Sequence, residues 1–300
     1  MINIKRIPLN EVFSRFPLPQ SMLTEFLRPR PGILDNPDIF FENYRSDEQE
    51  FKNFSLFKET AEDLPDTVYI CPVYLELYEY TNQSVMDVID YFSTLYAPRR
   101  VVFHWNHDID FASKYLKTKY YTNAYIINFN TSQPTPNDIL VPFWVINTKQ
   151  ITGKKLYRGG FIGTPNNPLR NQLARTLQGH PEYLLTSGLP TQQFLMKTAE
   201  CEFSFCPRGI GLSSYRFYEC FHLDTIPVLI ADKSSLPFLP EIDYNDICIK
   251  IPEDKVNNLN YIEKALNMVD IPKMKNKIQE VRHKFSLLGV QEEVHRRLKT

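Results

Sequence analysis

The stretch Cys206-Pro207-Arg208-Gly209-Ile210-Gly211-Leu212-Ser213-Ser214-Tyr215-Arg216-Phe217-Tyr218-Glu219 indicates how this chain folds. It follows the apolar run Glu202–Cys206, which predicts a buried strand, and it passes through a loop with two glycines into a helical pattern. The apolar positions of that helix recur at helical spacing, at Phe217, Cys220 and Phe221. Ser213 or Ser214 is expected to cap the helix. A buried strand that turns through glycine into a helix is typical of α/β proteins.

The same alternation of strands and helices continues on both sides of this stretch. We expect strands at 67–71 (ended by Pro72), 101–103, 124–129, 138–142, 155–162, 202–206 and 225–230, and helices at 84–96, from Pro168 onward and toward Leu298. Residues 1–65 are predicted to be irregular. Because the strands fall into two series, we predict an N-terminal α/β domain over 1–148 and a C-terminal one over 149–300, with a last helix able to pack back on the first domain.

Composition and charge exclude several classes of protein. With 34 basic and 35 acidic residues, the chain of 300 has a formal net charge of -1 and lacks the positive field of a nucleic-acid-binding protein. No signal peptide or membrane-spanning segment is visible, so we expect a soluble, cytoplasmic protein, with a domain cut free from a membrane anchor as the open alternative. The five cysteines form no CxxC pair, which favours free buried thiols over disulfides or zinc.

The stretch also predicts a site for an anion. Glycines let the backbone approach a ligand closely, and the amides at a helix start favour negative charge. Arg208 and Arg216 are suited to bind a diphosphate, and Glu219 to accept hydrogen bonds from a ribose diol. The alternative is a turn, a helix cap and a surface Arg–Glu pair, and spacing alone does not decide between the two.

The segment from Cys206 to Phe238 resembles the exostosin-like glycosyltransferase family. The motif of that family is matched in order and spacing by Pro207-Arg208-Gly209, Ser214, Arg216, Glu219, Ile226-Pro227-Val228, Asp232 and Pro237-Phe238. Weaker similarities are Phe161-Ile162-Gly163 with Arg170, Ile70-Cys71-Pro72-Val73-Tyr74, and His107-Asp108. Asp224-Thr225 departs from the family, in which Gly is common before Ile-Pro-Val.

The resemblance implies a GT-B fold, which is two Rossmann-like domains with a donor cleft between them. It implies a UDP-sugar donor bound by Gly163, Arg170, Pro207, Arg208, Gly209, Ser213, Ser214, Arg216 and Glu219. Xylose is the sugar that we expect, with other UDP-linked sugars left open. It further implies inversion at the anomeric carbon, an oligosaccharide or glycoprotein glycan as acceptor, and no essential metal, with Mn²⁺ and Mg²⁺ left open. Most animal and plant members are membrane-anchored, and a compact chain without an anchor is similar to the members that large algal viruses encode.

The general base is expected in the polar loop after the strand at 101–103. Asp108 is our first candidate and His107 the second, and a loop or cap role for Asp108 stays open. Weaker candidates are Glu76 and Glu79.

Three alternatives compete with this interpretation. Asp108-Ile109-Asp110 is a DxD, which chelates a donor-bound metal in the other main glycosyltransferase fold, but this would leave the residues from Arg208 to Glu219 without a role. A catalytically silent sugar-binding or nucleotide-sugar-binding subunit is the second hypothesis, and it would lack a titratable group facing the acceptor. A two-domain dehydrogenase is remote, because no GxGxxG follows a first strand.

Overall fold

The computed structural model describes residues 2–19, 57–105, 122–128, 131, 134–142, 151–212 and 214–299. They belong to two compact units, Met1–Val141 with Leu287–Thr300, and Pro142–Ser286. Among the described residues, each unit contains one sheet, and the strand pairs are all parallel. Two α/β units with parallel sheets confirm the predicted fold class of two Rossmann-like domains.

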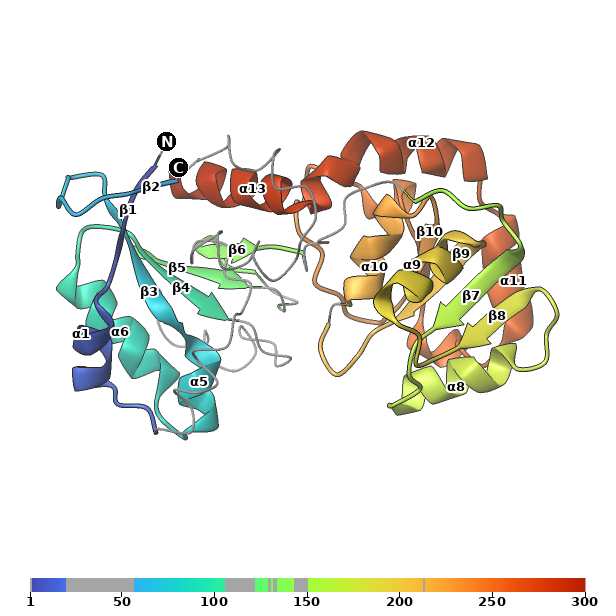
Figure 1. The fold of residues 1–300 in the computed structure, drawn as a ribbon, viewed down its shortest axis with the longest axis horizontal. Coiled ribbons are helices and arrows are strands. Elements are labelled where there is room, and N and C mark those ends of the chain that lie inside the picture. The colour runs from blue at the N-terminus through green and yellow to red at the C-terminus, as the bar shows by residue number, and fades with distance from the viewer. Residues whose placement is uncertain are drawn as a thin grey trace. The chain divides into compact units, whose positions relative to one another are not determined.

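The first unit has a sheet with the strand order β2-β1-β3-β4-β5-β6 (Figure 1). The strands are β1 (Ile2–Arg6), β2 (Phe57–Glu59), β3 (Val68–Tyr74), β4 (Val101–Trp105), β5 (Ala124–Asn128) and β6 (Asp138–Leu140). The helices in its described residues are α1 (Leu9–Arg15), α5 (Leu75–Tyr80), α6 (Val85–Leu95) and α13 (Leu287–Lys299). Every residue of β4 is buried, as expected for a central parallel strand.

Two features of this unit correct the sequence analysis. Residues 1–65 contain β1, α1 and β2, and the Ile2-Asn3-Ile4 alternation buries both isoleucines in the sheet. Strand β3 also continues past Pro72 to Tyr74. Its pairing with β4 shifts register between Ile70 and Tyr74, which is where a strand tolerates a proline.

The C-terminal helix α13 belongs to the first unit although it follows the second unit in sequence. Arg297 Nη2 donates a hydrogen bond to the carbonyl of Asp138 on β6 at 3.0 Å. The apolar face of α13 is buried at Val290, Val294 and Leu298. The predicted boundary lies between 148 and 149, whereas the units divide between Val141 and Pro142. Residues from Leu287 onward group with the first unit, which agrees with the prediction that the last helix can pack back on the first domain.

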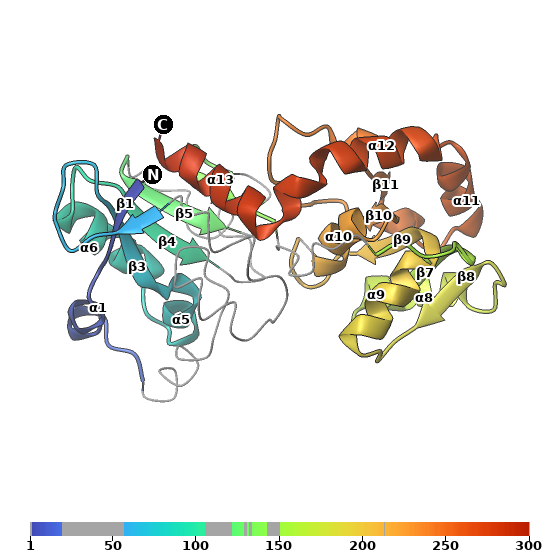
Figure 2. The same cartoon turned by 45° about the horizontal axis from the view of Figure 1, so that its top comes forward.

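The second unit has a sheet with the strand order β11-β10-β9-β7-β8 (Figure 2). The strands are β7 (Tyr157–Ile162), β8 (Tyr183–Thr186), β9 (Cys201–Pro207), β10 (Ile226–Ile230) and β11 (Ile249–Ile251). The α-helices are α8 (Pro168–Leu177), α9 (Thr191–Ala199), α10 (Tyr215–Glu219), α11 (Leu259–Asn267) and α12 (Ile271–Val281). The 3₁₀ helices are η1 (Cys220–His222), η2 (Tyr244–Asp246), η3 (Glu253–Lys255) and η4 (Arg282–Phe285). Helix α9 packs on β7 and β9, and α10 packs on β9 and β10.

None of the helices in the described residues has the length and apolar character that a membrane crossing requires.

The core of the second unit is centred on aromatic rings. Phe285 of η4 is fully buried and stacks on Phe221 with ring centroids 4.3 Å apart. It also meets the rings of Tyr218 and Phe238, at 5.7 Å and 5.6 Å. This cluster fixes α10 and η1 against the sheet.

Truncation of this ring tests how much the cluster stabilises the second unit. We expect Phe285→Ala to lower the free energy of unfolding by about 3–5 kcal/mol, because it removes a buried ring and leaves a cavity. The matched control is Met268→Ala, since Met268 is 78% exposed and its loss should change stability by less than about 0.5 kcal/mol. Urea titrations followed by circular dichroism measure both, and equal stabilities would contradict this account of the core.

Candidate functional site

The strand order of the second unit reverses between β7 and β9. The chain places β8 on one side of β7, then returns to place β9 on the other side and continues outward to β10 and β11. In open parallel sheets, ligands bind where the order reverses, outside the carboxyl ends of the strands. Gly163 directly follows β7 and Arg208 directly follows β9. Gly163 and Arg208, two of the predicted donor-binding residues, therefore lie at the switch point of this sheet.

Arg216 on α10 lies against the backbone that follows β7. A Cβ atom on Gly163 would overlap Arg216 Nη2 and would lie 3.0 Å from Arg216 Cζ, so a side chain here would displace the guanidinium from this position. The guanidinium carbon lies 5.3 Å from the ring centre of Phe161 and 5.7 Å from that of Phe194, within range of cation–π attraction. Among the described residues, its buried Nε and Nη1 atoms have no hydrogen-bond partner.

Arg170, in the first turn of α8, is the second guanidinium of the site. Pro168 opens this helix as predicted, and Asn167 Oδ1 caps it by accepting from Arg170 N at 2.9 Å. Arg170 Nη1 donates to Asn166 Oδ1 at 3.1 Å, whereas its buried Nε has no partner in the described part of the chain. Burial and then the charge of Arg216 lower the pKa of Arg170. The arginine pair, Arg170 and Arg216, thus concentrates positive charge that a bound anion would neutralise.

Arg208 has a different environment from the arginine pair. Its Nε and Nη2 donate to Glu253 Oε1 and Oε2 at 2.6 Å and 2.9 Å, and its Nη1 donates to the carbonyl of Gly209 at 3.1 Å. The hydrogen bonds with Glu253 raise the pKa of Arg208 and lower the pKa of Glu253. A contact between Arg208 and a diphosphate stays a prediction, and the protein itself already supplies acceptors for most of its donors.

Glu219 ends α10, within the electrostatic range of Arg216. Burial raises the pKa of the Glu219 carboxyl to about 7, and the charge of Arg216 opposes this rise. Ser214 occupies the N-cap position of α10, but its side chain makes no capping hydrogen bond. Since α10 has only five residues, its dipole sums few peptide units. The guanidinium groups therefore dominate the positive potential of the site.

The structure brings together four of the predicted donor-binding residues: Gly163 contacts Arg216, and Gly209 lies beside Arg170. Pro207 is the buried last residue of β9. Several other candidates lie outside the described residues, namely His107, Asp108, Ser213 and the side chain of Glu76. Sequence reasoning missed Glu253, which no motif marks and which reaches Arg208 only through the fold.

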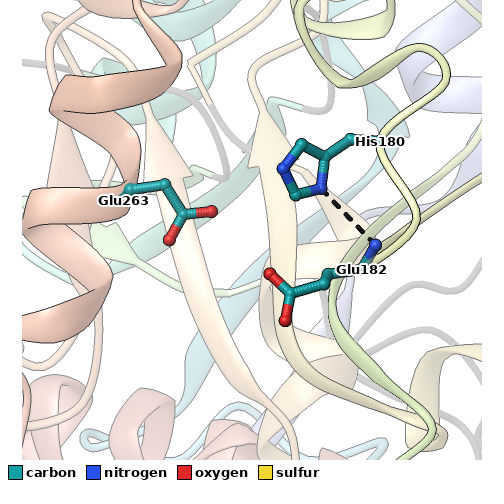
Figure 3. A group of neighbouring side chains, drawn as sticks. All are labelled: His180, Glu182 and Glu263. Atoms are coloured by element: carbon teal, nitrogen blue, oxygen red, sulfur yellow. Dashed lines mark hydrogen bonds between the residues drawn. The ribbon is translucent and has the colours of Figure 1, made fainter.

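A second group of ionisable side chains lies at the amino end of the same sheet. Figure 3 shows His180, Glu182 and Glu263, whose potential ligand atoms lie within 4.8 Å of one another. The Glu263 carboxylate already accepts hydrogen bonds from Arg158 Nε at 3.0 Å and from the hydroxyl of Tyr183. Because His180 and Glu182 precede β8, this group lies at the end of the sheet opposite to the arginine pair.

The contact between Gly163 and Arg216 can be tested with inorganic pyrophosphate as the probe. We expect Gly163→Ala to weaken pyrophosphate binding at least about tenfold, because the added methyl group displaces the guanidinium. Isothermal titration calorimetry measures the affinities of both single variants and of the double variant with Arg216→Ala. If the methyl group acts through Arg216, the double variant binds no more weakly than Arg216→Ala alone. Wild-type affinity of Gly163→Ala would contradict the role of this glycine.

The raised pKa of Glu219 predicts how stability changes with pH. Its folded-state pKa of about 7 exceeds the ordinary value of 4.5, so between these values the folded state binds more protons than the unfolded state. The contribution of Glu219 to the free energy of unfolding therefore falls as pH rises through this window, by at most about 3 kcal/mol. Urea titrations from pH 4.5 to 8 should show this fall in wild type relative to Glu219→Gln. A constant difference between the two proteins would show that Glu219 ionises normally.

Comparison with known proteins places the chain in a family. The model described as Exostosin GT47 domain matches residues 92–266, which is more than half of the chain. A protein of Oryza sativa subsp. japonica named "Probable glucuronosyltransferase GUT1" is 29% identical over 151 residues, 47% of this chain. The match spans only 33% of the length of that relative.

Solved structures give weaker likenesses. TarM is 10% identical with a TM-score of 0.40, and the match covers 80% of this chain and 56% of TarM. The pneumococcal O-GlcNAc transferase GtfA, in complex with UDP and GlcNAc, is 10% identical with a TM-score of 0.42, over 78% of this chain and 56% of GtfA. A glycosyltransferase of Rickettsia africae is 7% identical with a TM-score of 0.39, over 100% of this chain and 98% of that one. On the strength of the family model, this chain belongs to the exostosin GT47 family of glycosyltransferases.

Proposed function

We propose that this chain transfers a sugar from a UDP-linked donor to a hydroxyl group of a glycan acceptor, with inversion at the anomeric carbon. The observation that supports it most is the arginine pair at the switch point of the second sheet. Both guanidinium groups have buried Nε atoms without a partner among the described residues. Buried donors of this kind indicate a ligand with strong acceptors, and a diphosphate supplies them.

In the proposed reaction, the arginine pair acts on the leaving group. The acceptor hydroxyl attacks the anomeric carbon from the face opposite to the diphosphate, its proton passes to the general base, and the carbon–oxygen bond to the diphosphate breaks. Negative charge then grows on the diphosphate oxygens, where Arg170 and Arg216 would donate hydrogen bonds. One such preorganised donor is worth roughly 3 kcal/mol of transition-state stabilisation. Because fixed guanidinium charges serve this purpose, we propose a reaction that needs no metal.

Glu219 is proposed to bind the ribose. Its carboxyl would accept hydrogen bonds from the ribose hydroxyls, and these favour the ionised form. Since burial raises the pKa of this group to about 7, donor binding should release a proton near neutral pH. The affinity for donor should therefore increase as pH rises through this range.

The identities of the donor sugar, the acceptor and the general base are separate proposals. UDP-xylose is the first donor that we propose to test, and the rice relative named a glucuronosyltransferase adds UDP-glucuronate to the panel. The acceptor is proposed to be an oligosaccharide or a glycoprotein glycan. Asp108, with His107 as second choice, stays our candidate for the general base, and both lie outside the described residues.

Arg216→Ala tests the proposed function directly. We expect kcat/KM for sugar transfer to fall by about 10²–10³, because a donor to the developing charge is lost. The assay measures UDP release from a panel of UDP-sugars in the presence of glycan acceptors. The matched control is Arg175→Ala, which removes an exposed arginine from the other end of α8 and should leave kcat/KM unchanged. Wild-type turnover by the Arg216 variant would reject the proposal, and UDP binding without turnover of any donor would favour the silent subunit.

A further inference from the structure

Asp232 belongs to the motif that carries the family resemblance, and the site described so far gives it no role. It lies in the loop that follows β10. Its Oδ1 accepts a hydrogen bond from the backbone N of Glu253 at 2.9 Å, and its own backbone N donates to Glu253 Oε1 at 3.2 Å. Glu253 begins η3, just after β11. This reciprocal pair of hydrogen bonds therefore ties together the loops that follow β10 and β11.

Glu253 extends the link to the loop that follows β9. Its two carboxylate oxygens accept from Nε and Nη2 of Arg208, and a two-point pairing of this kind fixes the orientation of a guanidinium more tightly than one contact does. The backbone N of Arg208 also donates to the carbonyl of Ile230, the last residue of β10, at 3.2 Å. One carboxylate thus joins three adjacent loops at the edge of the sheet where ligands bind.

Arg208 in turn holds the backbone beside the arginine pair. Its Nη1 donates to the carbonyl of Gly209, and its own carbonyl accepts from Asn167 Nδ2 at 3.4 Å. Gly209 lies against Arg170, since a Cβ atom there would be 3.4 Å from Arg170 Nη2. Asn167 also caps the backbone N of Arg170. If Arg208 moved, Gly209 and Asn167 would lose a hydrogen bond each, and both of these residues contact Arg170.

We infer that Asp232 and Glu253 are positioning residues of the donor site, and that Arg208 works with them as a structural tie. The inference rests on the proposed function of the arginine pair. The three arginines differ in whether their N–H donors already have acceptors within the protein. Arg170 and Arg216 keep buried Nε atoms without partners in the described residues, and they bind the diphosphate. Arg208 is paired with Glu253 and Gly209, and it holds the loop in place.

Calorimetric titration with UDP tests this division of roles. Glu253→Gln should weaken UDP binding about tenfold, the loss expected when a hydrogen bond between charged groups is removed. Asp232→Ala should weaken it by a similar factor. Asp232→Asn is the matched control, because its Oδ1 can still accept from Glu253 N, and its affinity should stay within about twofold of wild type. Because Asp232 is exposed, its variants should melt at the wild-type temperature without ligand.

The outcomes separate this inference from the proposed function. If wild-type protein fails to bind UDP, the proposed function fails, and the positioning role fails with it. If Arg216→Ala loses UDP binding while Glu253→Gln and Asp232→Ala bind as wild type does, the positioning role alone is overturned. Equal weakening by Asp232→Asn and Asp232→Ala would also overturn it, since the acceptor geometry would then be irrelevant.

Discussion

The candidate site depends on one contact, in which a guanidinium group lies against a backbone that has no side chain. Gly163 leaves this space at the end of β7, and the guanidinium of Arg216 fills it within cation–π range of Phe161 and Phe194. Arg216 is partly buried, and its buried Nε and Nη1 atoms have no partner among the described residues. Buried donors without partners are costly for a fold, so the surrounding core must hold this side chain in place. The aromatic cluster around Phe285 provides that support, because it anchors α10 and η1. A bound diphosphate would supply the missing acceptors.

The order of the strands explains why residues distant in sequence meet at this contact. The reversal between β7 and β9 brings the loop after each of these strands to the same edge of the sheet. The three arginines at this edge are not equivalent. Two keep buried donors without partners among the described residues, while Arg208 is committed to Glu253. At this edge, Arg170 and Arg216 have donors available to an anion, whereas Arg208 and Glu253 fix the geometry of the loops.

Local sequence patterns predicted much of this arrangement, because strands, caps and helix starts follow from neighbouring residues. The spacing around Cys206 to Glu219 predicted the strand, the glycine loop and the helix, and Pro168 predicted the start of α8. The family resemblance added Gly163 and Arg170, which the structure places beside Arg216 and Gly209.

Contacts between distant segments were not predictable in the same way. Arg208 pairs with Glu253, which lies 45 positions further along the chain in a segment without a motif. The burial that raises the pKa of Glu219 likewise comes from the packed core and not from its neighbours in sequence. The strand β1 was missed because its apolar alternation is only three residues long before two basic residues follow.

The central claim is that Arg170 and Arg216 bind the diphosphate directly. The most direct test measures the ¹⁵N chemical shifts of the arginine Nε atoms by NMR. The Nε resonances can be assigned with Arg170→Lys, Arg216→Lys and Arg175→Lys and followed while UDP is added. The account predicts that the resonances of the first two arginines shift at saturating UDP, and that the resonance of Arg175 does not. Saturable UDP binding with both of these resonances unmoved would contradict the account.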